Sequence, residues 1–252
     1  MADGQNWTEG DVREALALYL VTDFGRFHSR NPDIITLAGR LDRTPGAVAL
    51  KLSNLAALDE SLPQKGMAHA SRADRAVWQE FLTDPSGVEL AYAAQMAFQP
   101  RASLHEPGLS EAPGQFDHRG GSASRPVMQR IGQDLFRRTV LTSYGGRCAL
   151  TGAEDTRILT ASHILPWAEA PAHRMWPTNG ICLSALHDRA FERHLISFDQ
   201  DWRMLIAPSV PPETRRILER GVSGSLHMPA RFQPDAGFMA QHRSRFEGDR
   251  RS

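Results

Sequence analysis

Residues 157–195, RILTASHILPWAEAPAHRMWPTNGICLSALHDRAFERHL, decide the fold of the second half of the chain. Side chains alternate well enough over residues 157–165 to predict a strand. A Pro-rich loop covers residues 166–178, and an Asn-Gly turn signal precedes the short apolar stretch ICLS. Residues 185–195 then have helical spacing. The pattern predicts strand, long loop, strand and helix.

Three polar residues lie at the joints of this pattern: His163 near the end of the first strand, Asn179 at the bend and His187 early in the helix. This arrangement suits phosphodiester cleavage, because a divalent ion is needed to neutralise the charge that builds up on the phosphate. A histidine can deprotonate the attacking water near neutral pH. The asparagine can either fix the loop or reach the metal through its carbonyl oxygen.

Six pieces of sequence resemble the HNH nuclease branch of the ββα-metal endonucleases. They are RIGQDLFR, RCALTG, ASHILPW, NGICLS, LHDRAFERHLISFD and a proline-then-histidine tail, in the order of that family over residues 128–246. The resemblance implies a ββα-metal fold in which His163 is the general base. Asn179 and His187 then correspond to the asparagine and the final histidine of the motif.

The metal site departs from the pattern of many such enzymes, which carry Asp, Glu or His immediately before the base. This chain has Ser162, and a hydroxyl is a poor metal ligand. We therefore expect one Mg2+ ion, with Mn2+ as a substitute, to rely on His187, Asn179, waters and the phosphate, with Ser162 as a poor third protein ligand. Asp188 and Glu192 are further candidate carboxylates.

The first part of the chain, residues 7–96, predicts several helices. Thr8 is a candidate N-cap for the first, and Asn31 and Thr44 are candidate caps for two short helices that each open with proline. Two short helices joined by a tight turn are typical of a helix-turn-helix, and the alternative is a plain helical hairpin in a small bundle. Residues 70–82 and 88–96 predict two more helices.

Residues 31–59 and 66–81 are similar to an N-terminal, winged-helix-like domain that precedes HNH modules in bacterial restriction endonucleases. That resemblance implies DNA reading, including the reading of modified DNA. We expect the second helix of the pair to face a DNA groove with four residues: Arg43, Thr44, Lys51 and Ser53. In the nuclease part we expect phosphate contacts from Arg174 and Arg189, for which a solvated surface role is the alternative.

Composition and charge set further bounds. The chain has 252 residues and no net charge, but residues 1–96 carry a net charge of −4 and the remainder +4. No apolar run is long enough to cross a bilayer, and the acidic, polar N-terminus lacks the layout of a signal peptide, so we expect a cytoplasmic protein. The two cysteines, Cys148 and Cys182, are too few for a disulfide framework, and we expect both to be reduced.

The remaining histidines and tryptophans have simpler interpretations. His173, His194 and His242 are expected to be structural, and a phosphate contact is a second possibility for His173. Trp167 and Trp176 are expected to pin the Pro-rich loop to the core.

These observations predict an α+β protein with three parts. Residues 1–96 form a helical DNA-reading domain, residues 97–126 a flexible linker rich in Pro, Gly and Ser, and residues 127–252 the HNH nuclease domain. The predicted function is metal-dependent cleavage of double-stranded DNA in restriction, with a homodimer as one route to a double-strand cut. The alternatives are a DNA-binding regulator with an inactive HNH scaffold and a non-specific nuclease or toxin.

Overall fold

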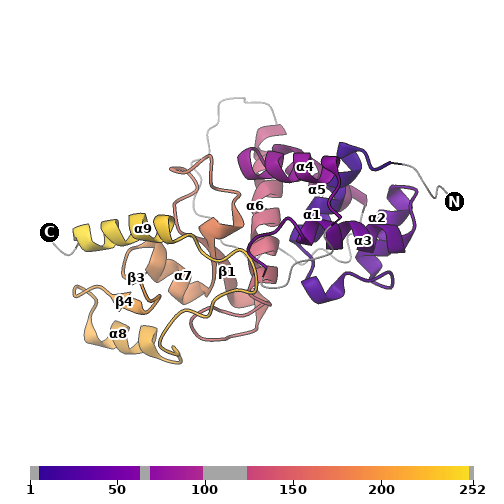
Figure 1. The fold of residues 1–252 in the computed structure, drawn as a ribbon. Coiled ribbons are helices and arrows are strands. Elements are labelled where there is room, and N and C mark those ends of the chain that lie inside the picture. Colours follow the sequence, from indigo (N-terminus) through magenta and orange to yellow (C-terminus); the bar gives the residue numbers. More distant parts are fainter. Residues whose placement is uncertain (1–5, 63–68, 99–123, 250–252) are drawn as a thin grey trace. The chain divides into compact units, whose positions relative to one another are not determined.

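The computed structural model describes residues 6–62, 69–98 and 124–249 (Figure 1). The chain divides into two units, Met1–Thr139 and Val140–Ser252. Helices and small antiparallel sheets make it an α+β protein, as the sequence predicts. Most of the predicted linker, residues 99–123, lies outside the described residues.

The described part of the first unit is helical. Its elements are α1 (Glu9–Leu20), a short 3-10 turn η1 (Phe24–Arg26), α2 (Pro32–Arg40), α3 (Pro45–Ala56), α4 (Arg72–Thr83), α5 (Ser86–Phe98) and most of α6 (Ser124–Ser143). The predicted caps are confirmed: the side chains of Thr8, Asn31 and Thr44 accept hydrogen bonds from the first turns of α1, α2 and α3. No strand occurs among residues 6–62, 69–98 and 124–139, so the expected wing has no counterpart in this part of the chain.

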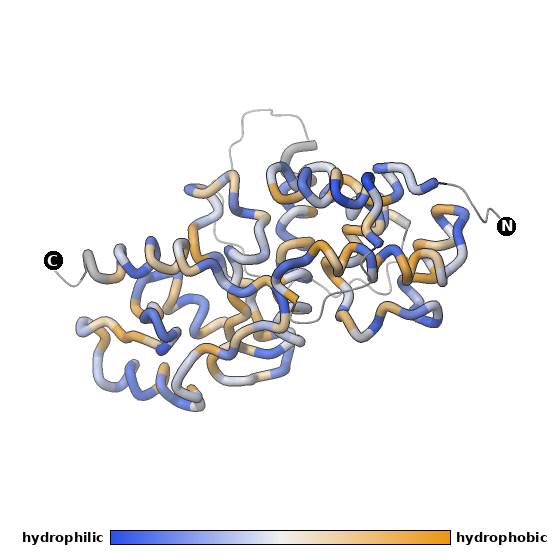
Figure 2. The backbone as a smooth tube through the Cα atoms, in the orientation of Figure 1, coloured by the Kyte–Doolittle hydropathy of each residue, from blue (hydrophilic) through white to orange (hydrophobic). Residues whose placement is uncertain are grey.

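Helix α1 is the centre of the first unit. Its residues 15–20 are all buried, and it packs against α2, α3, α4 and α5. The tube in Figure 2 shows apolar and polar residues alternating along the surrounding helices, as expected for helices that bury one face. Burial of these faces, together with the Tyr19 hydroxyl that donates to Asp59 at 2.6 Å, holds the bundle around α1.

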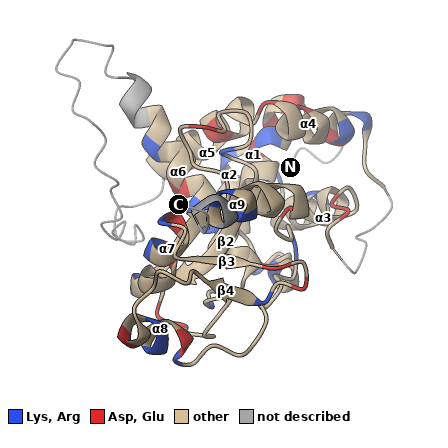
Figure 3. Ribbon diagram, turned by 90° about the vertical axis from the view of Figure 1, so that its left-hand side faces the viewer, with Lys and Arg blue, Asp and Glu red and all other residues tan. Residues whose placement is uncertain are grey.

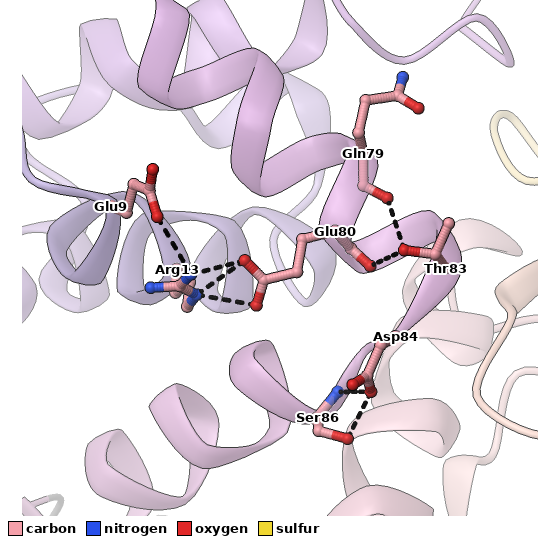
Figure 4. Close-up of polar contacts among 7 residues, drawn as sticks. All are labelled: Glu9, Arg13, Gln79, Glu80, Thr83, Asp84 and Ser86. Atoms are coloured by element: carbon pink, nitrogen blue, oxygen red, sulfur yellow. Dashed lines mark hydrogen bonds and ion pairs between the residues drawn. The ribbon is translucent and has the colours of Figure 1, made fainter.

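An ion pair joins α1 to α4 at the edge of this core (Figure 4). The Arg13 guanidinium donates from two nitrogens to the Glu80 carboxylate, with Nη2 2.5 Å from Oε2. Gly87, in the first turn of α5, lies against this pair, and a Cβ there would come within 2.5 Å of Glu80 Oε1. The close approach explains why a residue without a side chain stands at the second position of α5.

A second ion pair is fully inside the unit. Lys51 Nζ on α3 lies 2.7 Å from Asp74 Oδ1 on α4, and the two side chains are 5% and 0% exposed. Asp74 Oδ2 also accepts from the backbone N–H of Ser71, the N-cap of α4. One buried carboxylate therefore neutralises a buried ammonium and completes a helix cap.

The second unit contains the strand, loop, strand and helix that the sequence predicts. Strand β1 (Leu159–His163) pairs antiparallel with β2 (Gly180–Ser184), with His163 opposite Gly180, and α7 (Ala185–Glu192) packs against both strands. Short 3-10 turns η3 (Thr156–Ile158) and η4 (Pro177–Asn179) precede the two strands. The prediction of a ββα hairpin and helix is confirmed.

The elements after α7 were not predicted from the sequence. They are β3 (Ile196–Phe198) paired antiparallel with β4 (Met204–Ile206), then α8 (Pro212–Glu219) and α9 (Ala236–Asp249), which packs against β3. Acidic and basic residues both lie on α8 (Figure 3). At the start of the unit, Gly145 and Gly146 have φ of 61° and 68°, and the Gly146 N–H donates to the Leu141 carbonyl, which ends α6. Within the described residues no helix is both long enough and apolar enough to span a membrane.

The buried ion pair gives a stability prediction. Replacing Asp74 with Ala leaves the Lys51 ammonium buried without its counter-charge, which typically costs about 3–5 kcal/mol. We expect urea unfolding of Asp74→Ala to show a loss of that order. The control is Glu9→Ala, which removes a more exposed partner of Arg13 and should cost less than about 1 kcal/mol. Equal effects of the two substitutions would contradict this account.

Candidate active site

His163 is the last residue of β1, and its ring is fixed by the loop that follows. Its Nε2–H donates to the Arg174 backbone carbonyl at 2.9 Å. With the proton on Nε2, the lone pair of the neutral ring is on Nδ1. Burial lowers the pKa of His163 to about 4, and the hydrogen bond to Arg174 opposes this shift only in part. The imidazole is therefore neutral at pH 7, with Nδ1 as its basic nitrogen.

The loop between the strands returns to His163 through two further contacts. The Trp167 ring lies edge-on to the His163 ring, with centroids 5.4 Å apart. The Arg174 guanidinium carbon is 5.0 Å from the centre of the same indole ring. Trp167 therefore packs the loop against the last residue of β1, and the loop carries a cation on the face of the same indole ring.

Asn179 clamps the chain immediately after His163. Its side chain is fully buried, Oδ1 accepts from the Leu165 N–H at 2.8 Å, and Nδ2 donates to the Leu165 carbonyl at 3.2 Å. The Asn179 backbone carbonyl accepts from the Ile164 N–H at 2.9 Å. Of the two roles considered for Asn179, the geometry supports fixing the loop. A role as metal ligand stays a prediction, and the full burial of the side chain is what argues against it.

His187 is buried on the inner face of α7, with 2% of its surface exposed. Its Nδ1 accepts from the Ser184 hydroxyl at 2.8 Å, and its Nε2–H donates to the Leu218 carbonyl at 2.9 Å. Both ring nitrogens are thus used in holding α7 to the end of β2 and to α8. In this geometry His187 has structural contacts at both ring nitrogens, and its role as a metal ligand stays a prediction.

The predicted ligand set does not fit a divalent ion. Ser162 is buried, with 3% of its surface exposed, and the nitrogen or oxygen donors of Asn179 and His187 are engaged elsewhere. Among the described residues no group of three or more His, Cys, Asp or Glu side chains is close enough to hold a metal. Of the two further carboxylates, Asp188 is half-buried, whereas Glu192 is exposed and pairs with Arg189 at 2.7 Å.

The four residues expected to contact DNA at α3 all bond within the first unit, although only Lys51 is buried and Thr44 is exposed. Lys51 is buried against Asp74, and Arg43 pairs with Asp11 at 2.9 Å with 7% of its side chain exposed. Thr44 accepts from the Ala47 N–H as an N-cap, and the Ser53 hydroxyl donates to the Ala49 carbonyl within the helix. These contacts explain the four side chains through the fold alone, and a DNA-reading face at α3 stays a prediction.

The other residues singled out from the sequence have varied surroundings. His242 stacks on Phe191 and accepts from the Ser197 hydroxyl at Nδ1, and His194 lies 3.2 Å from it. Both cysteines are free thiols and buried, as expected. In the loop, the His173 ring packs against the rings of Trp176 and Phe238, where it has the structural role expected.

Two contacts of the site were missed by sequence reasoning. The Arg174 carbonyl and the Leu218 carbonyl each fix a histidine ring, at separations of 11 and 31 residues. Backbone carbonyls carry no side-chain signature, so no motif could identify them. The Ser184–His187 pair, in contrast, has the i, i+3 spacing of a helix start and could have been found.

A family comparison covers this segment. Residues 148–199, which contain β1, the loop, β2, α7 and β3, match the family model HNH_2, described as HNH endonuclease. The matched segment contains His163, Asn179 and His187. A search of curated proteins found no match to the chain.

The buried histidines predict how stability depends on pH. Burial is the main cause that lowers the pKa of His242 to about 4, below the value near 6.5 of an unfolded chain. The fold therefore favours the neutral ring, and its stabilisation is complete above pH 6.5 and is lost as the pH falls toward 4. His163 acts in the same direction.

We expect the free energy of unfolding, measured with urea at pH 7.5, 6 and 5, to decrease as the pH is lowered. The full loss, reached below pH 4, is about 3 kcal/mol per histidine. His242→Phe keeps a ring stacked on Phe191 but cannot be protonated. It should be less stable at pH 7.5 and show a smaller pH dependence than the wild type. The same pH dependence in both proteins would contradict the assignment.

Proposed function

We propose that this chain, which carries an HNH endonuclease domain at residues 148–199, is an endonuclease that hydrolyses phosphodiester bonds of double-stranded DNA with His163 as general base. One observation supports the base above all others: the Arg174 carbonyl holds the proton on Nε2, so that Nδ1 carries the lone pair. A base fixed at the end of a strand can take a proton from water without reorganising. The family match supports the reaction class.

The roles of the other motif residues follow from their contacts. Asn179 is a positioning residue, because it fixes the backbone of Leu165, two residues beyond the base. His187 holds α7 in place against β2 and α8. Neither residue touches the reacting atoms in this proposal. Their loss is expected to lower activity by displacing His163.

A divalent ion, Mg2+ with Mn2+ as substitute, is the proposed cofactor, as is typical of HNH nucleases. Such an ion would supply positive charge at the phosphate. Because the predicted ligands do not fit, we assign no step of the reaction to it. The absence of a three-ligand cluster in the described residues also favours a second candidate, a DNA-binding regulator with an inactive HNH scaffold.

The role in restriction, including restriction of modified DNA, rests on the resemblance of the first unit to domains that precede HNH modules. Cleavage of methylated, hydroxymethylated and unmodified plasmids by the full chain tests it. Preference for one substrate supports restriction, and equal cleavage of all three favours a non-specific nuclease or toxin. A double-strand cut would call for a homodimer or sequential nicking, because one active site cuts one strand.

Nicking of supercoiled plasmid in Mg2+ or Mn2+ separates the nuclease from the regulator. We expect His163→Ala to lower the rate by a factor on the order of 10²–10⁴, the usual contribution of a general base. Because the pKa of His163 is near 4, kcat/KM in the wild type should rise with pH around 4 and be flat above pH 5.5 as far as this base is concerned. A folded His163→Ala protein with wild-type activity would remove His163 from the mechanism.

The metal requirement is tested by titration. We expect EDTA to abolish nicking and Mg2+ to restore it. His187→Ala leaves the Leu218 carbonyl without its donor, and should lower stability by about 1–3 kcal/mol. In the folded fraction the Mg2+ concentration at half-maximal rate should be unchanged.

Asp188→Asn, which alters the half-buried neighbouring carboxylate, is the comparison variant in the same titration. An increased Mg2+ requirement in His187→Ala, with none in Asp188→Asn, would restore His187 as a ligand.

A further inference from the structure

The loop of residues 166–178 ties Arg174 to His163 by two separate contacts. The first is the backbone: the Arg174 carbonyl accepts the hydrogen bond from His163 Nε2. The second is the Trp167 ring, which contacts the His163 ring on one side and the Arg174 guanidinium on another. Arg174 is therefore tied to His163 by its main chain and by a shared aromatic neighbour.

The charge of Arg174 is not neutralised by the loop that carries it. Glu169 is the single acidic residue in the sequence of that loop, and it pairs with Arg245 of α9 at 2.5 Å. Arg147, Arg157, Arg189 and Arg203 in the same unit all pair with carboxylates. Within the described residues Arg174 has no such ion pair, and its cationic group lies on an aromatic face instead.

A guanidinium held in this way has the chemistry of a phosphate-binding group. Its planar fork can donate two parallel hydrogen bonds to phosphate oxygens, and stacking on an aromatic ring fixes the plane of the fork. A positive charge in this place would also offset the charge that develops on the phosphate during hydrolysis. The predicted metal ligands, by contrast, are engaged in the fold.

We propose that Arg174 is a catalytic residue that binds the scissile phosphodiester beside His163, and that Trp167 is the positioning residue that holds Arg174 and the base in register. This proposal rests on the proposed nuclease function and names a further group of the same site. It goes beyond a general contact with DNA, because it places the guanidinium at the bond that is cut.

The test combines binding and cleavage by the full-length protein. Binding of a fluorescein-labelled 20-base-pair duplex in EDTA is followed by anisotropy between about 50 and 200 mM NaCl. Over this range the affinity that comes from phosphate contacts falls steeply with salt. We expect Arg174→Met to lower the slope of log K against log salt by about 0.9, the value for one phosphate contact. Nicking of supercoiled plasmid in Mg2+ should fall by about 10²–10³, as for loss of one group that stabilises transition-state charge.

Matched variants separate charge from geometry. Arg174→Lys keeps the charge but not the planar fork, so it should keep the salt dependence and lose most of kcat. Guanidinium ion at millimolar concentration should partly restore nicking by Arg174→Ala. The control Arg203→Ala, which alters an exposed arginine paired with Asp201, should show wild-type nicking and no response to guanidinium.

Trp167 is tested by the pair Trp167→Phe and Trp167→Leu. Phe retains an aromatic face and should keep most of kcat, whereas Leu should lose it with little change in the salt dependence of binding. Thermal unfolding of each variant shows whether the fold is intact, and an unfolded Arg174→Met protein is replaced by Arg174→Gln.

The outcomes distinguish the two proposals. If the wild type does not nick plasmid, the nuclease function fails, while an unchanged salt dependence in Arg174→Met would overturn the phosphate contact independently. If the wild type nicks, His163→Ala does not, and Arg174→Met nicks as the wild type does, the proposal for Arg174 alone is overturned. If guanidinium does not restore nicking by Arg174→Ala and Arg174→Lys is fully active, Arg174 contributes only a positive charge. That result would also overturn the proposal for Arg174.

Discussion

The geometry of the site depends on the amide of Asn179 and its two hydrogen bonds to the backbone of Leu165. Strand β1 ends at His163, and beyond it the chain needs another partner for its N–H and C=O groups. The Asn179 side chain takes the place of a neighbouring strand there. As a result the direction of β1 is maintained past the base, and the loop that follows starts from a fixed point.

From this point the loop can return to the base. Pro166 and Pro177 limit the backbone at its two ends, and Trp167 packs against the ring of His163. The return places a carbonyl at Nε2 and a guanidinium on the indole face. The strand, the clamp and the loop therefore define one arrangement of base and cation, and α7 is held behind them by His187.

The sequence predicted the ββα segment well because its period, its turn residues and its helix start are local properties. Thr8, Asn31 and Thr44 were recognised as caps for the same reason. The partners of Lys51 and His187 could not be recognised, since Asp74 and Leu218 lie 23 and 31 residues away. A polar residue on a helix can be assigned to solvent or to a ligand only if no neighbouring element offers it a partner. A single sequence does not show which elements are neighbours.

The proton on His163 Nε2 has a consequence for how the loop and the base communicate. The tautomer is set by a carbonyl that belongs to the loop, and the low pKa is set by the burial that the loop provides. Lifting the loop would remove the acceptor and admit water, so the ring would become a stronger base with no preferred tautomer. The basicity of His163 therefore changes together with the position of the loop. A ligand that closes the loop also selects the ring nitrogen that receives the proton.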